Sequence, residues 1–322
     1  MIKRWIVLAV LLALWTGVAE TGLAAESKKV LVVTVTTGFR HSSIEVAERV
    51  IQQLGRDSGA FTVDYARVTP PPGPTKPTEP KKIDDEAKAQ AAREKYEAEM
   101  KVFNEAETRF KEEEKVYAAE QKRVLAEKLS LDSLKGYDAV IFANTTGDLP
   151  LPDPKGLIEW VKAGHGFVGT HSASDTFHGF KPYVEMLGGE FQTHDDQAGV
   201  ECINEDPSHP ACQHLESRFA VFDEIYLIKT FERTHVHMLL GLDKEPNKKT
   251  PGYFPISWCK QVGEGRVFYT SLGHREDVWD PEWKGRKNSP EVALAYQKHL
   301  LHGIKWALGL EAGDAKPQTA SK

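Results

Sequence analysis

Histidines follow three strand-like runs of this sequence closely. His41 comes after KVLVVTVTTG, His171 after GFVGT and His274 after GRVFYTSLG. An imidazole with an ordinary pKa of about 6.5 takes up and returns protons at neutral pH, which suits proton abstraction beside a carbonyl group. Together with His194 of GGEFQTHDD, these side chains are the predicted catalytic histidines. We expect the four imidazoles to meet in one pocket.

The segment GFVGTHSASDTFHGF, residues 166–180, reads as a short strand that ends in a sharp turn before a helical stretch. Asp175 lies four positions after His171, so its carboxylate could fix the tautomer of that imidazole and take part in catalysis, or it could cap the helix. Both interpretations stay open. Ser172 lies where a helix would begin, and a capping role is favoured over a nucleophilic one.

The same residue types could also bind a metal. Imidazole and carboxylate ligands together suit Zn, Ni, Mn or Fe. The sequence contains no HExxH motif, and its HVH at His235 and His237 is interpreted as a strand with one exposed face. A divalent metal ion held by the four predicted histidines is therefore an alternative to pure acid–base catalysis.

Several further polar or aromatic side chains are candidates for contacts with a substrate. Asp223 and Glu224 form a carboxylate pair in FDEIY, and Arg40 precedes His41. Trp279 could stack on a sugar ring or cover the core. The predicted substrate-binding residues are Arg40, Asn144, Ser172, Asp223, Glu224 and Trp279.

The elements that must position these residues alternate between strands and helices. Strand-like runs cover 29–38, 61–68, 137–146, 166–172 and 265–274, and helix-like runs cover 42–55 and 153–164. In the first helix-like run, apolar residues recur at helical spacing. This alternation predicts an α/β fold with an open, mostly parallel sheet and helices on both faces. Ligands bind such sheets at the carboxyl ends of the strands, where the histidines lie.

An insertion at about 70–130 interrupts the alternation. It begins with the proline-rich spacer TPPPGPTKPTEPKK and continues without Gly or Pro from Ile83 to Lys135. The abundance of Glu, Lys and Ala predicts one long charged helix over about 83–129. The favoured interpretation is a solvated helix held by charge pairs three or four positions apart. The alternative is an arm that binds a partner or a second copy of the chain.

Composition and the chain ends limit the possible functional classes and indicate the compartment. The net charge of −6 argues against a nucleic-acid binder. Residues 1–25 resemble a signal peptide, which predicts a secreted or periplasmic protein that stays off the membrane once the peptide is cleaved, the alternative being an uncleaved anchor. In an oxidising compartment, Cys202 and Cys212 could form a disulfide. Residues 311–322 are expected to be a flexible tail.

Several blocks resemble the trehalose-utilisation, or ThuA-like, family. They are VTTGFRHSSIEVA, YDAVIFANTTGDLPL, GFVGTHSASDTFHGFKPYVEMLGGEFQTHD, HPACQHLESRFAVFDEIY and GEGRVFYTSLGH. The resemblance spans about 28–310 outside the insertion and implies a flavodoxin-like, class I glutamine amidotransferase-like three-layer fold. It also implies a role in sugar metabolism, particularly of 3-keto-glycosides. His171 lies where glutamine amidotransferases carry their nucleophilic cysteine, so amidotransferase chemistry is not expected.

These observations together predict an exported carbohydrate-active protein. Its predicted chemistry is acid–base catalysis on a keto-sugar or glycoside, by isomerisation, elimination or hydrolysis, through the histidine cluster. One alternative is a non-catalytic sugar-binding or interaction protein that uses the charged helix as its working surface. A second alternative is a metal-dependent hydrolase.

Overall fold

The computed structural model describes residues 27–318, and its centre is one nine-stranded sheet of order β2-β1-β3-β4-β11-β10-β9-β6-β7. The first five strands in this order pair in parallel. They are β1 (Lys28–Val33), β2 (Phe61–Ala66), β3 (Ala139–Ala143), β4 (Gly166–Thr170) and β11 (Gly265–Thr270). Their spatial order is the 2-1-3-4-5 order of flavodoxin-like sheets. The predicted strands and fold class are confirmed.

An antiparallel extension, which the sequence analysis did not predict, continues the sheet beyond β11. Its strands are β10 (Pro251–Val262), β9 (His237–Lys244), β6 (Ala198–Asn204) and β7 (Arg218–Asp223). A separate two-stranded ribbon pairs β5 (Glu190–Thr193) with β8 (Leu227–Lys229). The extension brings the end of β7 toward the carboxyl ends of the parallel strands.

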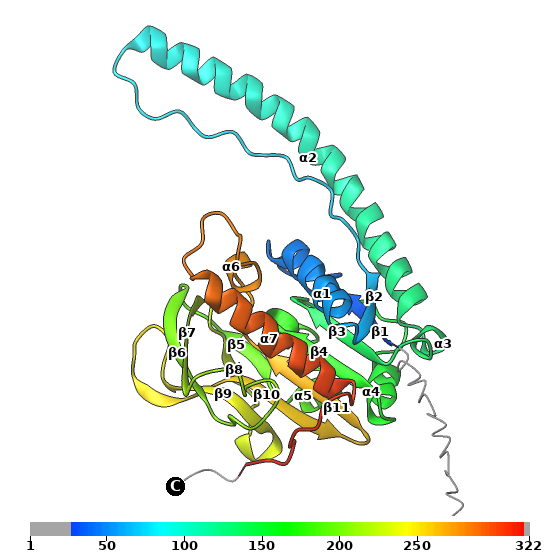
Figure 1. The fold of residues 1–322 in the computed structure, drawn as a ribbon. Helices are drawn as coiled ribbons and strands as arrows, with labels where there is room; N and C mark the ends of the chain where they lie inside the picture. Colours follow the sequence, from blue (N-terminus) through cyan, green and yellow to red (C-terminus); the bar gives the residue numbers. More distant parts are fainter. Residues whose placement is uncertain (1–26, 319–322) are drawn as a thin grey trace, which may run out of the picture.

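Helices cover both faces of the sheet (Figure 1). One face is covered by α1 (Ile44–Ser58), α6 (Glu276–Trp279) and α7 (Pro290–Ala307), and the other by α3 (Leu131–Leu134), α4 (Pro154–Lys162) and α5 (Lys181–Leu187). Side chains alternate along a strand, so Val30 and Val32 of β1 join the first core while Leu31 and Val33 join the second. Two 3-10 helices, η1 (His171–Asp175) and η2 (Arg233–His235), complete the described elements. The predicted three-layer arrangement is confirmed.

The insertion forms a helical arm, α2 (Glu86–Lys128), that projects from the body with the proline-rich spacer running beside it (Figure 1). The Asp85 side chain accepts a hydrogen bond from Lys88 N and so caps the helix start. Within α2 the buried residues are Gln121 and Leu125, both near its base. The prediction of one long charged helix is confirmed, and almost all of it is solvated.

The structure corrects one expectation about the cysteines and describes part of the C-terminal tail. All three cysteines lie in the described part of the chain and are buried free thiols, so the predicted Cys202–Cys212 disulfide is wrong. In the expected flexible tail, 311–322, the Gln318 amide donates to Met238 O and Lys316 O contacts His237 Nδ1. Its flexibility stays a prediction.

The predicted signal peptide, residues 1–25, lies outside the described residues. Among the helices of residues 27–318, none combines the length and the apolar composition needed to cross a membrane.

Candidate active site: a histidine–glutamate centre

Three imidazoles and one carboxylate converge at the carboxyl ends of the parallel strands. His171 Nε2 lies 3.2 Å from His41 Nε2 and 3.3 Å from His274 Nδ1. Glu224 Oε1 lies 3.1 Å from His274 Nδ1 and 3.7 Å from His171 Nε2. We call these four residues the His–Glu centre. The structure thus brings together three of the four predicted histidines and adds a carboxylate that the sequence analysis had assigned to substrate binding.

His171 stands on a sharp turn between β4 and η1. Its φ of 43° lies in the left-handed region, which side-chain-bearing residues rarely adopt. The turn is held from β11, because Tyr269 Oη donates to His171 O at 2.7 Å and Ser271 O lies 2.9 Å from His171 Nδ1. A carbonyl only accepts, so Nδ1 carries the proton and the lone pair of Nε2 points into the centre.

The loop that carries His274 is held by the carboxylate of Asp223. Asp223 accepts hydrogen bonds from the backbone N–H of Gly273 at 2.7 Å, His274 at 3.3 Å and Arg275 at 3.0 Å. The side chain of Asp223 is fully buried, which corrects the predicted role of this residue in substrate binding. Asp223 instead fixes the loop that carries His274.

Asn144 performs a similar task at the end of β3. Its side-chain amide donates to Ser43 Oγ and Gly273 O, both at 2.9 Å, and its oxygen accepts from Thr170 Oγ1 at 2.8 Å. The residue is fully buried, so the predicted substrate contact is corrected to a structural tie. The tie joins the start of α1, the end of β4 and the His274 loop.

Burial sets the protonation of the centre. It lowers the pKa of His41 to about 4, with a further lowering from the charge of His274. Burial and the neighbouring imidazoles of His41 and His274 lower the pKa of His171. Burial also acts to lower the pKa of His274, but the hydrogen bond and the charge of Glu224 outweigh it and raise that pKa. His41 and His171 are therefore neutral imidazoles at neutral pH.

Glu224 joins the centre to an open cleft of about 800 Å³. Its Oε1 faces His274, whereas its Oε2 lies 3.3 Å from Nδ1 of His194. The lining residues are His194, Asp195, Asp196, Gln197, Phe222, Glu224, Asn247 and Lys287. The fourth predicted histidine thus lies at the outer side of Glu224, in the cleft wall, and not among the three converging rings.

The remaining predicted site residues lie apart from the centre or beneath it. The carboxylate of Asp175 makes a short hydrogen bond with His178 rather than with His171, so its predicted role on the His171 tautomer is corrected. Arg40 bonds Thr34 O and pairs with Glu45. Ser172 is buried with its Oγ 3.3 Å from His41 Nδ1, which makes it a support for that ring.

Trp279 belongs to the core. Its ring is fully buried against Tyr296, and its indole N–H donates to Gly273 O at 2.8 Å. The predicted stacking face for a sugar is therefore corrected, because no face of this ring reaches the cleft within the described structure. The alternative interpretation, that Trp279 covers the core, agrees with its position.

Tyr226 is a site residue that the sequence analysis missed. Its ring packs 4.4 Å from the His171 ring and 5.7 Å from the His194 ring, centroid to centroid. It lies between the centre and the cleft wall and is buried. Its place two residues after Glu224 in FDEIY was the available signal.

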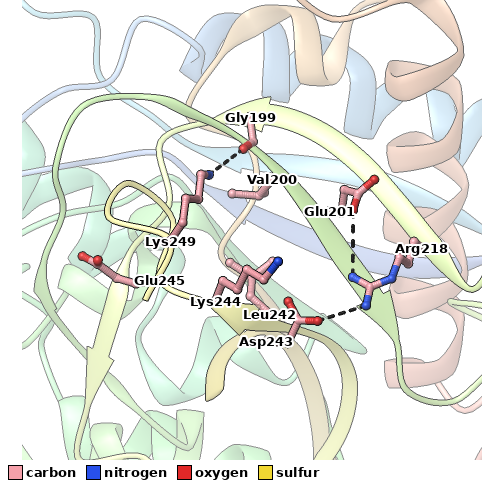
Figure 2. Close-up of a pocket in the computed structure, with 9 residues that line it drawn as sticks. All are labelled: Gly199, Val200, Glu201, Arg218, Leu242, Asp243, Lys244, Glu245 and Lys249. Carbon is pink, nitrogen blue, oxygen red and sulfur yellow. Dashed lines mark hydrogen bonds and ion pairs between the residues drawn. The ribbon is translucent and has the colours of Figure 1, made fainter. Parts of the chain in front are cut away.

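A second hollow, of about 380 Å³, lies in the antiparallel part of the sheet (Figure 2). Two of its charged side chains already have partners: Arg218 lies 2.9 Å from Asp243, and Lys249 donates to Gly199 O at 3.0 Å. The nine residues drawn there include neither histidine nor cysteine, and their polar groups do not converge on one point. The His–Glu centre is therefore the better candidate for chemistry.

Comparisons with known proteins identify the family and the fold of this chain. The sequence profile of the ThuA family, described as trehalose utilisation, matches residues 84–307. The chain belongs to the ThuA family. The matched region of this ThuA-family chain contains His171, Glu224 and His274, whereas His41 precedes it. Curated proteins gave no significant match.

Two solved structures share the fold. A putative ThuA-like protein from Parabacteroides merdae is 16% identical with a TM-score of 0.56, and the alignment covers 88% of this chain and 90% of that one. A putative ThuA-like protein from Bacteroides uniformis is 18% identical with a TM-score of 0.54, covering 90% and 94%. At these identities the likeness concerns the fold, which is flavodoxin- and glutamine amidotransferase-like. In this ThuA-family chain, the turn after β4 presents His171.

Proposed function

We propose that this ThuA-family protein is an exported enzyme that acts on a carbohydrate, a keto-sugar or keto-glycoside, by acid–base chemistry at the His–Glu centre. The observation that carries the proposal is the convergence of three imidazoles and a carboxylate at strand ends, with Glu224 opening onto a polar cleft. Export rests on the predicted signal peptide alone.

The cleft has the composition of a sugar site. Its walls offer the carboxylates of Asp195 and Asp196 and the amides of Gln197 and Asn247, which can accept from and donate to hydroxyl groups. Phe222 adds an apolar face of the kind that packs on the C–H groups of a pyranose ring. A ligand with many hydroxyls and a few apolar edges fits this lining better than an extended apolar one.

The arrangement suits removal of a proton from the carbon beside a carbonyl group. In that step the C–H bond breaks, the proton passes to a base, and the electron pair moves onto the carbonyl oxygen, which becomes an enolate. Glu224 faces both the centre and the cleft, so its carboxylate, with His194 beside it, is the proposed base. Isomerisation and elimination of keto-sugars share this first step.

His171 acts through other groups in this proposal. Its side chain is fully buried beside His41, His274 and Tyr226, so a sugar in the cleft meets Glu224 and His194 first. His171 and His41 are therefore positioning residues, and they set the charge and orientation of His274 and Glu224.

The test is a turnover assay on a panel of 3-keto-glycosides and their parent glycosides, with substrate loss and product formation followed by chromatography. We expect the wild type to convert at least one keto-sugar and Glu224→Gln to lose roughly 10²-fold or more in kcat, the scale for losing a general base. Glu190→Gln is the matched control, because Glu190 also pairs with a histidine, His178, outside the centre.

Full turnover by Glu224→Gln would contradict the proposal. So would a wild type that converts none of the panel, either as purified or after addition of divalent metal salts. Equal losses in Glu224→Gln and Glu190→Gln would assign the effect to folding and would also count against it.

A further inference from the structure

We infer that the His–Glu centre binds one divalent first-row transition-metal ion, with His41 Nε2, His171 Nε2, His274 Nδ1 and Glu224 Oε1 as its ligand atoms. The binding of the ion stands on the geometry of the centre alone. Its part in turnover rests on the proposed function.

The distances fit a single ion. One ligand atom from each of the four residues lies within 4.8 Å of all the others. Bonds of about 2.0–2.1 Å at tetrahedral angles place two ligand nitrogens about 3.3–3.4 Å apart. The observed Nε2–Nε2 distance from His171 to His41 is 3.2 Å, and the distance to His274 Nδ1 is 3.3 Å. Two of the three imidazole pairs therefore already have the spacing of ligands around one ion.

The ring orientations agree with the distances. The three imidazole planes stand nearly perpendicular to one another, at 89° for His41 and His171, 87° for His41 and His274, and 79° for His171 and His274. Lone pairs of imidazole nitrogens lie in the ring plane, so these edge-on contacts allow nitrogens to face one another and exclude stacked rings. Packing of aromatic faces does not require this convergence of nitrogens.

Not every close contact in the centre can be a hydrogen bond. The proton of His171 is on Nδ1, facing Ser271 O, so its Nε2 is an acceptor that has both His41 Nε2 and His274 Nδ1 within 3.3 Å. If His274 Nδ1 donates to Glu224 Oε1, its contact with His171 Nε2 is left without a proton. A cation at the midpoint of the four atoms is attracted by every one of them.

Groups around the centre hold its ligands as the outer contacts of metal sites do. His171 Nδ1 donates to a backbone carbonyl, and Ser172 Oγ lies 3.3 Å from His41 Nδ1. The three backbone hydrogen bonds to Asp223 hold the His274 loop. In metal proteins, ligand histidines almost always bond through the second ring nitrogen in this way, which fixes the tautomer and the ring orientation.

The ligand set selects the class of ion. Three imidazole nitrogens and one carboxylate oxygen suit Zn²⁺, Mn²⁺, Fe²⁺, Co²⁺ or Ni²⁺, whereas Mg²⁺ and Ca²⁺ prefer sites made of oxygen atoms. A sugar oxygen that reached the ion from the cleft would be a fifth ligand, a coordination number that zinc sites adopt during catalysis. There a divalent ion would stabilise the enolate oxygen of the proposed reaction. Glu224 Oε2, with His194 beside it, would remain available to take up the proton.

The test measures metal binding without any substrate. The full chain is stripped with a chelator, and Zn²⁺, Mn²⁺, Co²⁺ and Ni²⁺ are titrated separately by calorimetry, with stoichiometry from elemental analysis. We expect one ion per chain and a higher melting temperature with the ion. Glu224→Gln keeps the shape of the side chain and should weaken binding roughly 10–100-fold or more, the scale already seen for changes around metal ligands.

His171→Asn should abolish stoichiometric binding, because asparagine tolerates the left-handed backbone but its shorter side chain does not reach the centre. His178→Gln is the matched control: His178 also lies against two carboxylates, Asp175 and Glu190, and this change should leave binding at one ion per chain. If His171→Asn fails to fold by circular dichroism, Glu224→Gln decides.

The inference is overturned if the wild type binds none of the four ions at micromolar concentrations. It is also overturned if Glu224→Gln binds as tightly as the wild type, or if only His178→Gln loses the ion. Ion binding without turnover of any keto-sugar would support the inference and contradict the proposed function. Turnover by a chain that binds no ion would contradict the inference and support the proposed function.

Discussion

The His–Glu centre and the helical arm are built in opposite ways. The centre joins His171 to His41 and to His274, residues 130 and 103 positions apart, and buries His171 completely. The arm is held by exposed pairs such as Arg123 with Glu120 and Glu127, three or four positions apart. A change in the centre therefore has no local substitute, whereas the arm can lose any one pair at little cost.

The largest expected effect of this difference is on catalysis. His171→Asn should lower kcat roughly 10²-fold, the scale for misplacing catalytic groups, because it removes the ring that holds His41 and His274 in place. It also leaves Ser271 O without its donor, which should cost about 1–3 kcal/mol of stability. Substrate turnover and chemical denaturation of the same variant measure the two effects, with His178→Gln as the control histidine.

Unchanged kcat in a folded His171→Asn protein would break the comparison, since the centre would then be no more than a packed cluster. A large fall in stability with unchanged kcat per folded molecule would mean the same.

Much of the fold could be predicted from the sequence because its signals are local. The apolar runs of β1, β3 and β4 are short and continuous, as buried parallel strands are, and the alternation with helices indicates their layering. The arm is equally local. The antiparallel extension was missed because β6 and β7 carry mixed burial patterns, unlike the continuous apolar runs of the parallel strands.

The site could be predicted only where it follows from the parallel strands. His41, His171 and His274 end three of these strands, so the carboxyl-end rule brings them together. Glu224 follows β7, in the missed extension, and its place in the centre could not be inferred. Trp279 and Asp223 were misjudged because their residue types suit a sugar site, while burial gives them structural tasks.

A smaller effect is expected when the pH is lowered. The body should lose stability, whereas the helical signal of the arm should not change with it. Burial lowers the pKa of His299 to about 3, and its ring bridges Ala211 O and Ser257 Oγ inside the core. Because the unfolded chain binds this proton more readily than the folded one, the stability from His299 is complete above about pH 6.5 and is lost as the pH falls below it. The loss should be about 2 kcal/mol between pH 6.5 and pH 5.

Denaturant unfolding at several pH values, followed by tryptophan fluorescence, measures this loss. His299→Gln can still donate to Ala211 O and accept from Ser257, and it should flatten the pH dependence by about that amount. An equally steep dependence in the variant would show that other groups cause the acid sensitivity. The arm has few buried groups to titrate, so its helical signal should not follow the His299 transition.

Removing the outer arm should have the smallest effect on the body. The spacer lies against the helix, with Pro71 beside Glu112, Glu113 and Val116, so a short Gly-Ser linker can replace residues 73–112. This deletion removes 27 of the 43 residues of α2 but keeps its base, where Gln121 donates to Thr36 O at 2.8 Å and Leu125 is buried. Circular dichroism should show a clear loss of helical signal.

Turnover and the unfolding midpoint of the body should stay within about twofold and a few degrees of the full chain, because exposed segments contribute little to a core. Gln121→Ala is the matched comparison, since it breaks the contact of the arm base with the loop that leads to His41. That loop is also held by Thr146, whose Oγ1 donates to Phe39 O at 2.8 Å, so even this variant should keep most activity. A body that unfolds when the outer arm is removed, or a more than tenfold loss of kcat, would show that the arm supports the centre and that the two regions are coupled.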